Sequence, residues 1–128
     1  MLKKSIIVLC SCLIVMLAAC KKNGTGGENT IAAFPKHHGL SIPNATVYIK
    51  YGATELPGVN ASDFDDSKVA EREGSAAPHV HFEGLLKGDY YIYAVGFDST
   101  INEPVRGGLS VKITSKSGEK NVDIPVTE

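Results

Sequence analysis

The sequence predicts an all-β fold, a single Greek-key-type β-sandwich of about seven short strands. Apolar and polar residues alternate with a period of two in several short runs, as they do on half-buried strands. Glycine, proline, asparagine and serine residues, which favour turns, separate these runs. No long run with helical periodicity follows Cys20, and this absence argues against an α-helical or α/β domain.

The chain begins with a segment that does not belong to this predicted fold. Lys3 and Lys4 precede a mostly apolar run, 5–17, which is shorter than the roughly 20 residues that span a bilayer. A basic start, a short apolar run and small residues before a cleavage point are typical of a secretory signal peptide. The residues Leu-Ala-Ala-Cys at 17–20 resemble the lipobox of bacterial lipoproteins. That resemblance implies removal of residues 1–19 and lipidation of Cys20. The alternatives are an uncleaved anchor helix and an ordinary signal peptide with a chance cysteine.

The expected mature chain divides into a tether and one domain. Residues 20–29 contain three glycines and no large apolar side chain, so we expect the lipidated cysteine to be followed by a flexible tether. Residues 30–128 suffice for one core. The other cysteines, Cys10 and Cys12, lie in the predicted signal peptide, so no disulfide is expected in the mature chain.

Local composition also bears on where the protein acts. An aspartate after the lipidated cysteine would resemble the inner-membrane retention signal of some gram-negative bacteria, but Lys21 stands there. We therefore expect a lipid anchor in the outer membrane of a gram-negative bacterium, facing the periplasm, with the cell surface as the alternative. The chain has 13 basic and 14 acidic residues, a balance that gives no reason to expect a nucleic-acid partner.

The alternating runs place the strands within the domain. A hairpin over 79–98 is the central element, because it combines two alternating runs with most of the aromatic residues. Pro35 is expected to end the first strand, and Pro43-Asn44 to form a turn. The remaining segment, 52–78, is predicted as a long polar loop with one helical turn at 67–73. The other strands are expected at 30–34, 45–51, 109–114 and 121–126.

Two of these segments resemble the transthyretin-like sandwich family, which includes carboxypeptidase regulatory-like and collagen-adhesin B-type domains. The first is a turn and strand at 42–49, Ile-Pro-Asn-Ala-Thr-Val-Tyr-Ile, and the second is the hairpin sequence Phe-Glu-Gly-Leu-Leu-Lys-Gly-Asp-Tyr at 82–90. The family often has glycine at the position of Asn44 and proline at that of Lys87. The resemblance implies a mostly non-catalytic module. Glycine followed by tyrosine also resembles a tyrosine corner, in which the hydroxyl of Tyr90 bonds to nearby main chain.

Metal binding is one candidate chemistry. His79, His81 and Glu83 share one face of a predicted strand, and imidazole and carboxylate groups are zinc ligands. The pair His37-His38 would add a ligand if that loop lies alongside. The alternative is a solvated polar face that binds no ion. Asp63, Asp65 and Asp66 do not continue into an EF-hand calcium loop, because lysine and glycine stand where glycine and glutamate are required.

A second candidate site is aromatic. Tyr48, Tyr91 and Tyr93 are expected to face away from the core and to bind protein or sugar, or else to cover the second face of their sheet.

These observations lead to one functional prediction and two alternatives. No spacing assigns a nucleophile, a general acid and a general base, so we predict that the protein is not an enzyme. We expect a non-catalytic, lipid-anchored envelope lipoprotein that binds another envelope protein or a glycan and needs no cofactor. The alternatives are a periplasmic protein that binds a divalent metal through His79 and His81, and a structural or adhesive surface subunit.

Overall fold

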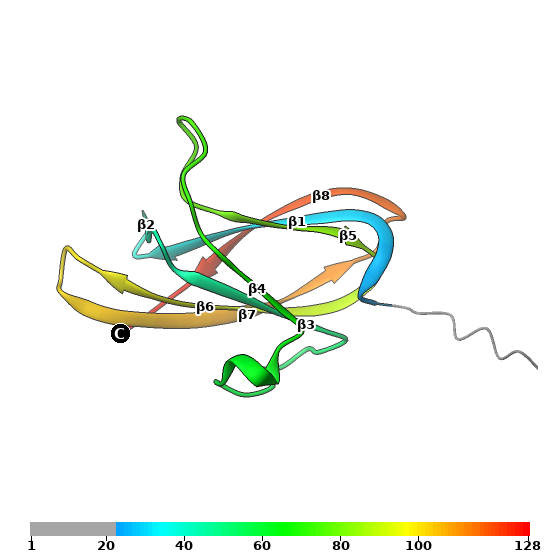
Figure 1. Cartoon of the computed structure of the whole chain (residues 1–128), viewed down its shortest axis with the longest axis horizontal. Helices are drawn as coiled ribbons and strands as arrows, with labels where there is room; N and C mark the ends of the chain where they lie inside the picture. The colour runs from blue at the N-terminus through cyan, green and yellow to red at the C-terminus, as the bar shows by residue number, and fades with distance from the viewer. Residues whose placement is uncertain (1–22) are drawn as a thin grey trace, which may run out of the picture.

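The computed structural model describes residues 23–128, and the predicted signal peptide and Cys20 lie outside these residues. Two four-stranded sheets pack face to face, which confirms the predicted all-β sandwich (Figure 1). The part of the chain that is described contains no α-helix, only a 3-10 turn, η1, at Ala61–Asp63. None of its helical segments is long or apolar enough to cross a membrane.

The first sheet is organised around the longest strand, β1 (Thr25–His37). Strand β5 (Val80–Leu85) pairs with β1 in antiparallel orientation, and β8 (Ser117–Pro125) pairs with its other side in parallel orientation. The two-residue strand β2 (Leu40–Ser41) folds back on the end of β1. We call this sheet A.

The second sheet, sheet B, is antiparallel throughout. Its order is β4 (Asp66–Val69), β3 (Thr46–Tyr51), β6 (Gly88–Asp98) and β7 (Glu103–Ile113). The predicted hairpin over 79–98 is therefore wrong in its pairing. Both of its strands form, but β5 pairs with β1 in sheet A and β6 pairs with β3 and β7 in sheet B, so the turn between them connects the two layers.

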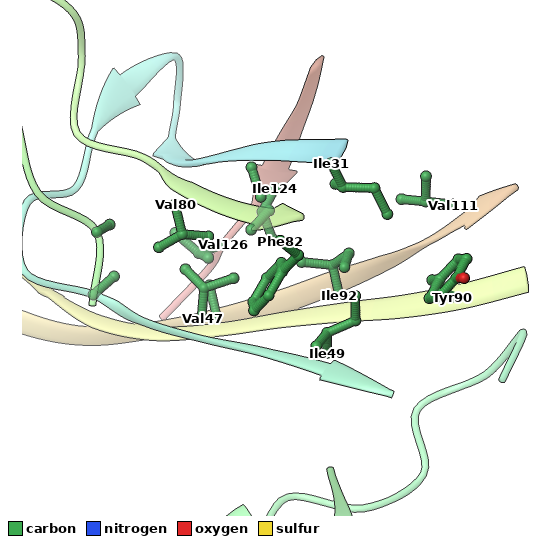
Figure 2. Close-up of a cluster of buried hydrophobic side chains, with 14 of the residues drawn as sticks. Ile31, Val47, Ile49, Val80, Phe82, Tyr90, Ile92, Val111, Ile124 and Val126 are labelled. Carbon is green, nitrogen blue, oxygen red and sulfur yellow. The ribbon is translucent and has the colours of Figure 1, made fainter. Parts of the chain in front are cut away.

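The core lies between the two sheets, and Figure 2 shows its aliphatic and aromatic side chains pointing into this space. Val80 and Phe82 of β5 are buried, as the alternation in the sequence predicts. Residues from both sheets complete the cluster, among them Ile31, Val47, Ile49, Tyr90, Ile92, Val111, Ile124 and Val126.

Strand β1 starts earlier than expected, so the predicted tether over 20–29 is wrong for Thr25–Asn29. The side-chain amide of Asn29 is buried and donates to the carbonyl groups of Ser115 and Lys116, at 3.0 Å each. A Cβ on Gly27 would lie 2.2 Å from the carbonyl oxygen of Leu85. Gly27 therefore permits the close approach of two backbones. The glycines of this segment do not serve flexibility alone.

Strand β1 also ends later than expected, because it continues through Pro35 to His37. Its antiparallel pairing with β5 ends at Ala33, so the pairing with β5 requires no N–H from Pro35. The carbonyl of Pro35 accepts a hydrogen bond of 3.0 Å from the amide of Ile42.

The loop over 52–78 contains structure that the sequence did not predict. The expected helical turn at 67–73 is wrong, because Asp66–Val69 form β4 against β3. Main-chain hydrogen bonds then join Glu71 and His79 in both directions, at 3.1 and 3.3 Å. The chain from 72 to 78 is therefore a closed loop, which projects from the sandwich beside β5 (Figure 1).

Strands β7 and β8 are longer than the predicted runs 109–114 and 121–126. The additional residues of β7 include Gly107, where a Cβ would lie 2.1 Å from the carbonyl oxygen of Pro125. The close approach of β7 to Pro125 therefore requires glycine at position 107. The alternation of apolar and polar residues in the sequence does not reveal this requirement.

Candidate functional site

His79 and His81 lie on the outer face of sheet A, as their alternation with Val80 and Phe82 predicts. Their ring centroids are 4.7 Å apart. The ring of Phe34, on neighbouring β1, stacks on His79 with a centroid distance of 4.8 Å and an interplanar angle of 22°. His79 is only 9% exposed, so its imidazole is tightly packed. The imidazole of His81 is half-buried.

A main-chain contact sets the orientation of the His79 ring. Its Nδ1 lies 2.7 Å from the carbonyl oxygen of Ala77, a group that only accepts hydrogen bonds. The proton of the neutral ring is therefore on Nδ1, and the lone pair of Nε2 is free. Metal-binding histidines use this arrangement, in which a hydrogen bond to one ring nitrogen orients the other toward the ion.

Glu73, rather than the predicted Glu83, lies closest to the two histidines. An oxygen of Glu73 is 3.8 Å from Nε2 of His79. Ligand atoms of Glu73, His79 and His81 all lie within 4.8 Å of one another. We call these three residues the His79 site. Glu83 is exposed on the same strand and lines the same hollow, but it is not a member of this group.

Membership of Glu73 in this site could not be predicted from its position in the sequence, because Glu73 belongs to the projecting loop. The main-chain pairing of Glu71 with His79 folds that loop back and brings Glu73 over the ring of His79. A polar run between strands carries no sign of this closure in a single sequence.

The hollow at the His79 site has a volume of about 280 Å³ and an acidic rim. Glu71, Glu73 and Glu83 line it, against a single lysine, Lys68. The ammonium of Lys68 donates to the carbonyl of His81 at 2.5 Å, which holds that charge at the edge of the hollow. The balance of charge in the hollow therefore favours a cation.

The pair His37-His38 does not join this site. Ala33, Pro35 and His37 are buried while Phe34 and Lys36 are half-buried, so His37 faces the interior and Phe34 the outer face with His79. His37 and His38 instead lie near Glu128, with ligand atoms of these three residues within 4.8 Å of one another. The expectation that this loop adds a ligand to His79 and His81 is therefore wrong.

His37 is paired with a buried carboxylate. Its Nδ1 lies 2.8 Å from Oδ2 of Asp98, and both side chains are about 95% buried. This hydrogen bond, followed by the negative charge of Glu128, raises the pKa of His37 against the opposing effect of burial. Hydrogen bonds from the hydroxyl of Thr100, and then from His37, lower the pKa of Asp98 to about 2.

The predicted aromatic site is largely covered. Tyr93 is 4% exposed, because the ring of Phe64 stacks on it at a centroid distance of 5.7 Å and an angle of 4°. Phe64 also contacts Tyr48, at 5.1 Å. Tyr91 is half-buried. Tyr48 and Tyr93 therefore cover the second face of their sheet, as the alternative interpretation predicts, and do not form an open patch.

Apolar side chains are instead exposed at the far end of sheet B. Thr46 of β3 pairs with both Val69 of β4 and Val95 of β6, so the two valines flank Thr46 on the same face of the sheet. Phe97 follows two residues after Val95, and Ile101 lies in the turn beyond it. Each of the four is between 40% and 50% exposed. We call Val69, Val95, Phe97 and Ile101 the apolar strip.

Tyr90 has a structural role, as the tyrosine-corner pattern predicts. It is fully buried, and its hydroxyl donates to the carbonyl oxygen of Leu86 at 2.6 Å. The same hydroxyl accepts a hydrogen bond of 2.9 Å from the amide of Gly24. Burial raises the pKa of Tyr90, so the group remains a neutral donor.

Comparison with known proteins adds no relative to this description. No protein-family model matches the sequence, and no curated protein matches it either.

Proposed function

We propose that this protein is a non-catalytic, lipid-anchored module of the gram-negative cell envelope, and that it docks another envelope protein through the apolar strip. The resemblance of 17–20 to a lipobox supports the anchor. The resemblance of 42–49 and 82–90 to transthyretin-like domains supports a binding module. The observation that carries the proposal is the position of the apolar strip relative to the expected anchor.

An anchor at Cys20 would hold one end of the sandwich against the membrane. Only three residue steps separate Cys20 from Asn23, which corresponds to at most about 10 Å of extended chain. Gly24 contacts Leu86 and Tyr90, so the start of β6 lies at this end. Strand β6 then runs for 11 residues, about 35 Å, to Asp98. The apolar strip, at the far end of β6, would therefore face away from the membrane.

The composition of the apolar strip favours a protein partner. Three of its four side chains are aliphatic, and such side chains are stabilised when they pack against apolar groups of another protein. Glycan sites more often present aromatic rings with polar groups around them, and the aromatic side chains Tyr48 and Tyr93 are covered here by Phe64.

Photo-cross-linking in intact cells tests the docking surface. We expect a full-length chain with p-benzoylphenylalanine at Phe97 to form a discrete adduct with one envelope protein. The same amino acid at Glu119, an exposed position on β8 of sheet A, is the matched control and should give no such adduct. The substitution Val95→Asp should abolish the adduct at Phe97. Adducts at both positions, or at neither, would contradict docking through the apolar strip.

A second candidate function is divalent metal binding at the His79 site. One specific observation favours it, namely that two imidazoles and the carboxylate of Glu73 converge while Ala77 holds Nδ1 of His79. A set of two histidines and one carboxylate, with a fourth position open to water, suits zinc.

Zinc titration with matched variants tests this candidate. Glu73→Gln and His81→Ala alter exposed or half-buried residues, so neither should prevent folding. We expect each to weaken zinc binding at this site by at least tenfold. Glu83→Gln is the control, since that carboxylate lies outside the converging group, and should change binding little. Equal effects of Glu73→Gln and Glu83→Gln would exclude this geometry.

A further inference from the structure

A second group of potential ligands lies on the opposite face of sheet A, where β1 turns into β2. Lys36 pairs with Ser41 and His37 with Leu40, which leaves His38 and Gly39 as a two-residue turn. Both have positive φ angles, 48° and 78°, as a type I′ turn requires. The first position of such a turn usually holds asparagine, aspartate or glycine. Histidine at this position places its ring 4.2 Å from that of His37, centroid to centroid.

Asp98 fixes the orientation of His37. One carboxylate oxygen of Asp98 holds Nδ1 of His37 at 2.8 Å. The other oxygen accepts hydrogen bonds from the amide and the hydroxyl of Thr100, at 2.9 and 2.6 Å. The carboxylate is thus itself held in place, and it directs Nε2 of His37 toward the space beside His38. Carboxylate–histidine pairs of this kind orient and strengthen metal ligands.

The second ring nitrogen of His37, Nε2, lies beside a carboxylate, which is a further type of zinc ligand. Nε2 lies 2.8 Å from Oε2 of Glu128, yet it is the one buried side-chain nitrogen or oxygen in residues 23–128 without a hydrogen bond of acceptable geometry. Glu128 is exposed, so its carboxylate is free to adjust. A zinc ion would accept the lone pair of this buried, oriented nitrogen and would bind the adjacent exposed carboxylate.

We propose that His37, His38 and Glu128 form a binding site for Zn²⁺, with Asp98 as the residue that positions His37. The three ligand atoms lie within 4.8 Å of one another. Ligands of a tetrahedral zinc ion at about 2.0–2.1 Å are roughly 3.4 Å apart, so zinc binding would require rotation of the exposed His38 and Glu128 side chains. Water fills the fourth position. The site is independent of the His79 site, since no residue belongs to both.

Zinc titration in a background that lacks the His79 site isolates this second site. The full chain carrying Glu73→Gln and His81→Ala, purified in detergent, should still bind one Zn²⁺ per molecule by calorimetry. Adding His38→Ala or Glu128→Gln should weaken this binding by at least tenfold. Both changes affect exposed side chains, so a retained amide NMR spectrum is expected and confirms folding. No zinc binding in the background variant, or binding unaffected by both additional changes, would overturn the proposal. Neither result depends on docking or on the anchor.

The positioning of His37 by Asp98 can be tested separately. On addition of Zn²⁺, nitrogen-detected NMR of the imidazoles should show His37 bound through Nε2 while Nδ1 keeps its proton. Asp98→Asn should weaken zinc binding by about 10- to 100-fold and change the tautomer population of His37 in the zinc-free protein. Binding through Nδ1, or an unchanged affinity in a folded Asp98→Asn chain, would contradict the positioning role. His37→Ala is avoided as the test because that side chain is buried and its removal opens a cavity.

Discussion

Tyr90 joins two segments of main chain through one hydroxyl group. It donates to Leu86, accepts from Gly24 and packs its ring edge-on against Tyr51, with centroids 5.9 Å apart. Tyr90→Phe keeps the ring but leaves the buried groups of Leu86 and Gly24 without this partner. We expect the free energy of unfolding to fall by about 1–3 kcal/mol, measured by urea denaturation.

Tyr91→Phe is the matched control for this prediction. Tyr91 is half-buried on the opposite face of the same strand, so its change should shift the free energy of unfolding by no more than about 0.5 kcal/mol. Equal losses in the two variants would show that the hydroxyl of Tyr90 has no special role in stability.

At the scale of elements, the start of β1 belongs to the sandwich and not to a tether. Gly27→Ala would place a methyl group 2.2 Å from the carbonyl oxygen of Leu85, so the two strands must separate locally. We expect a loss of about 1–3 kcal/mol in the free energy of unfolding, as in other overpacked sites, measured by thermal or urea denaturation. Glu28→Ala, at the adjacent exposed position, should be nearly neutral. A neutral effect of Gly27→Ala would mean that this segment is loosely attached in solution.

The connection from β3 to β4 acts as a cover over sheet B. Its Phe64 stacks on Tyr93, while its Asp65 accepts a hydrogen bond of 2.7 Å from the amide of Tyr51. Phe64→Ala removes the aromatic stack, which contributes about 0.5–1.5 kcal/mol beyond its buried area. We expect faster proteolytic cleavage within 52–65 and increased solvent access to Tyr93. Asp63→Asn, in the same connection but without a ring, should leave the exposure of Tyr93 unchanged.

The elements that could be predicted from the sequence are those that depend on residues close together in the chain. Strands β5 and β6 and the role of Tyr90 follow from alternation and from turn residues within about ten positions. The placement of these two strands in different sheets does not follow from either. The strand at Thr25–Asn29 could not be predicted, because a glycine that permits close packing has the same composition as a glycine in a linker. Glu73 depends on a loop closed by main-chain bonds, and the pair His37–Asp98 spans 61 positions. Contacts of this kind leave no periodicity in one sequence.

At the scale of the whole molecule, the groups with functional potential lie on both sheets, and Val69 of the apolar strip also lines the hollow at the His79 site. The His79 site lies on the outer face of sheet A, and the apolar strip lies on sheet B at the far end of β6 from Gly24. The geometry thus allows one end of the domain to remain near a membrane while the distal surface contacts a partner. This arrangement gives the proposed anchor a direct consequence for function, because a lipid on Cys20 would determine which end of the domain faces away from the membrane.

The most direct test of this account is the mass of the N-terminal peptide of the protein isolated from the membranes of its native cells. We predict a peptide that begins at Cys20 and carries a diacylglycerol on the thiol, with its formation blocked by globomycin. Cys20→Ala should yield an unprocessed, unlipidated chain. An unmodified wild-type peptide that begins at Met1, from protein recovered in the cytoplasm, would contradict the lipid-anchored module.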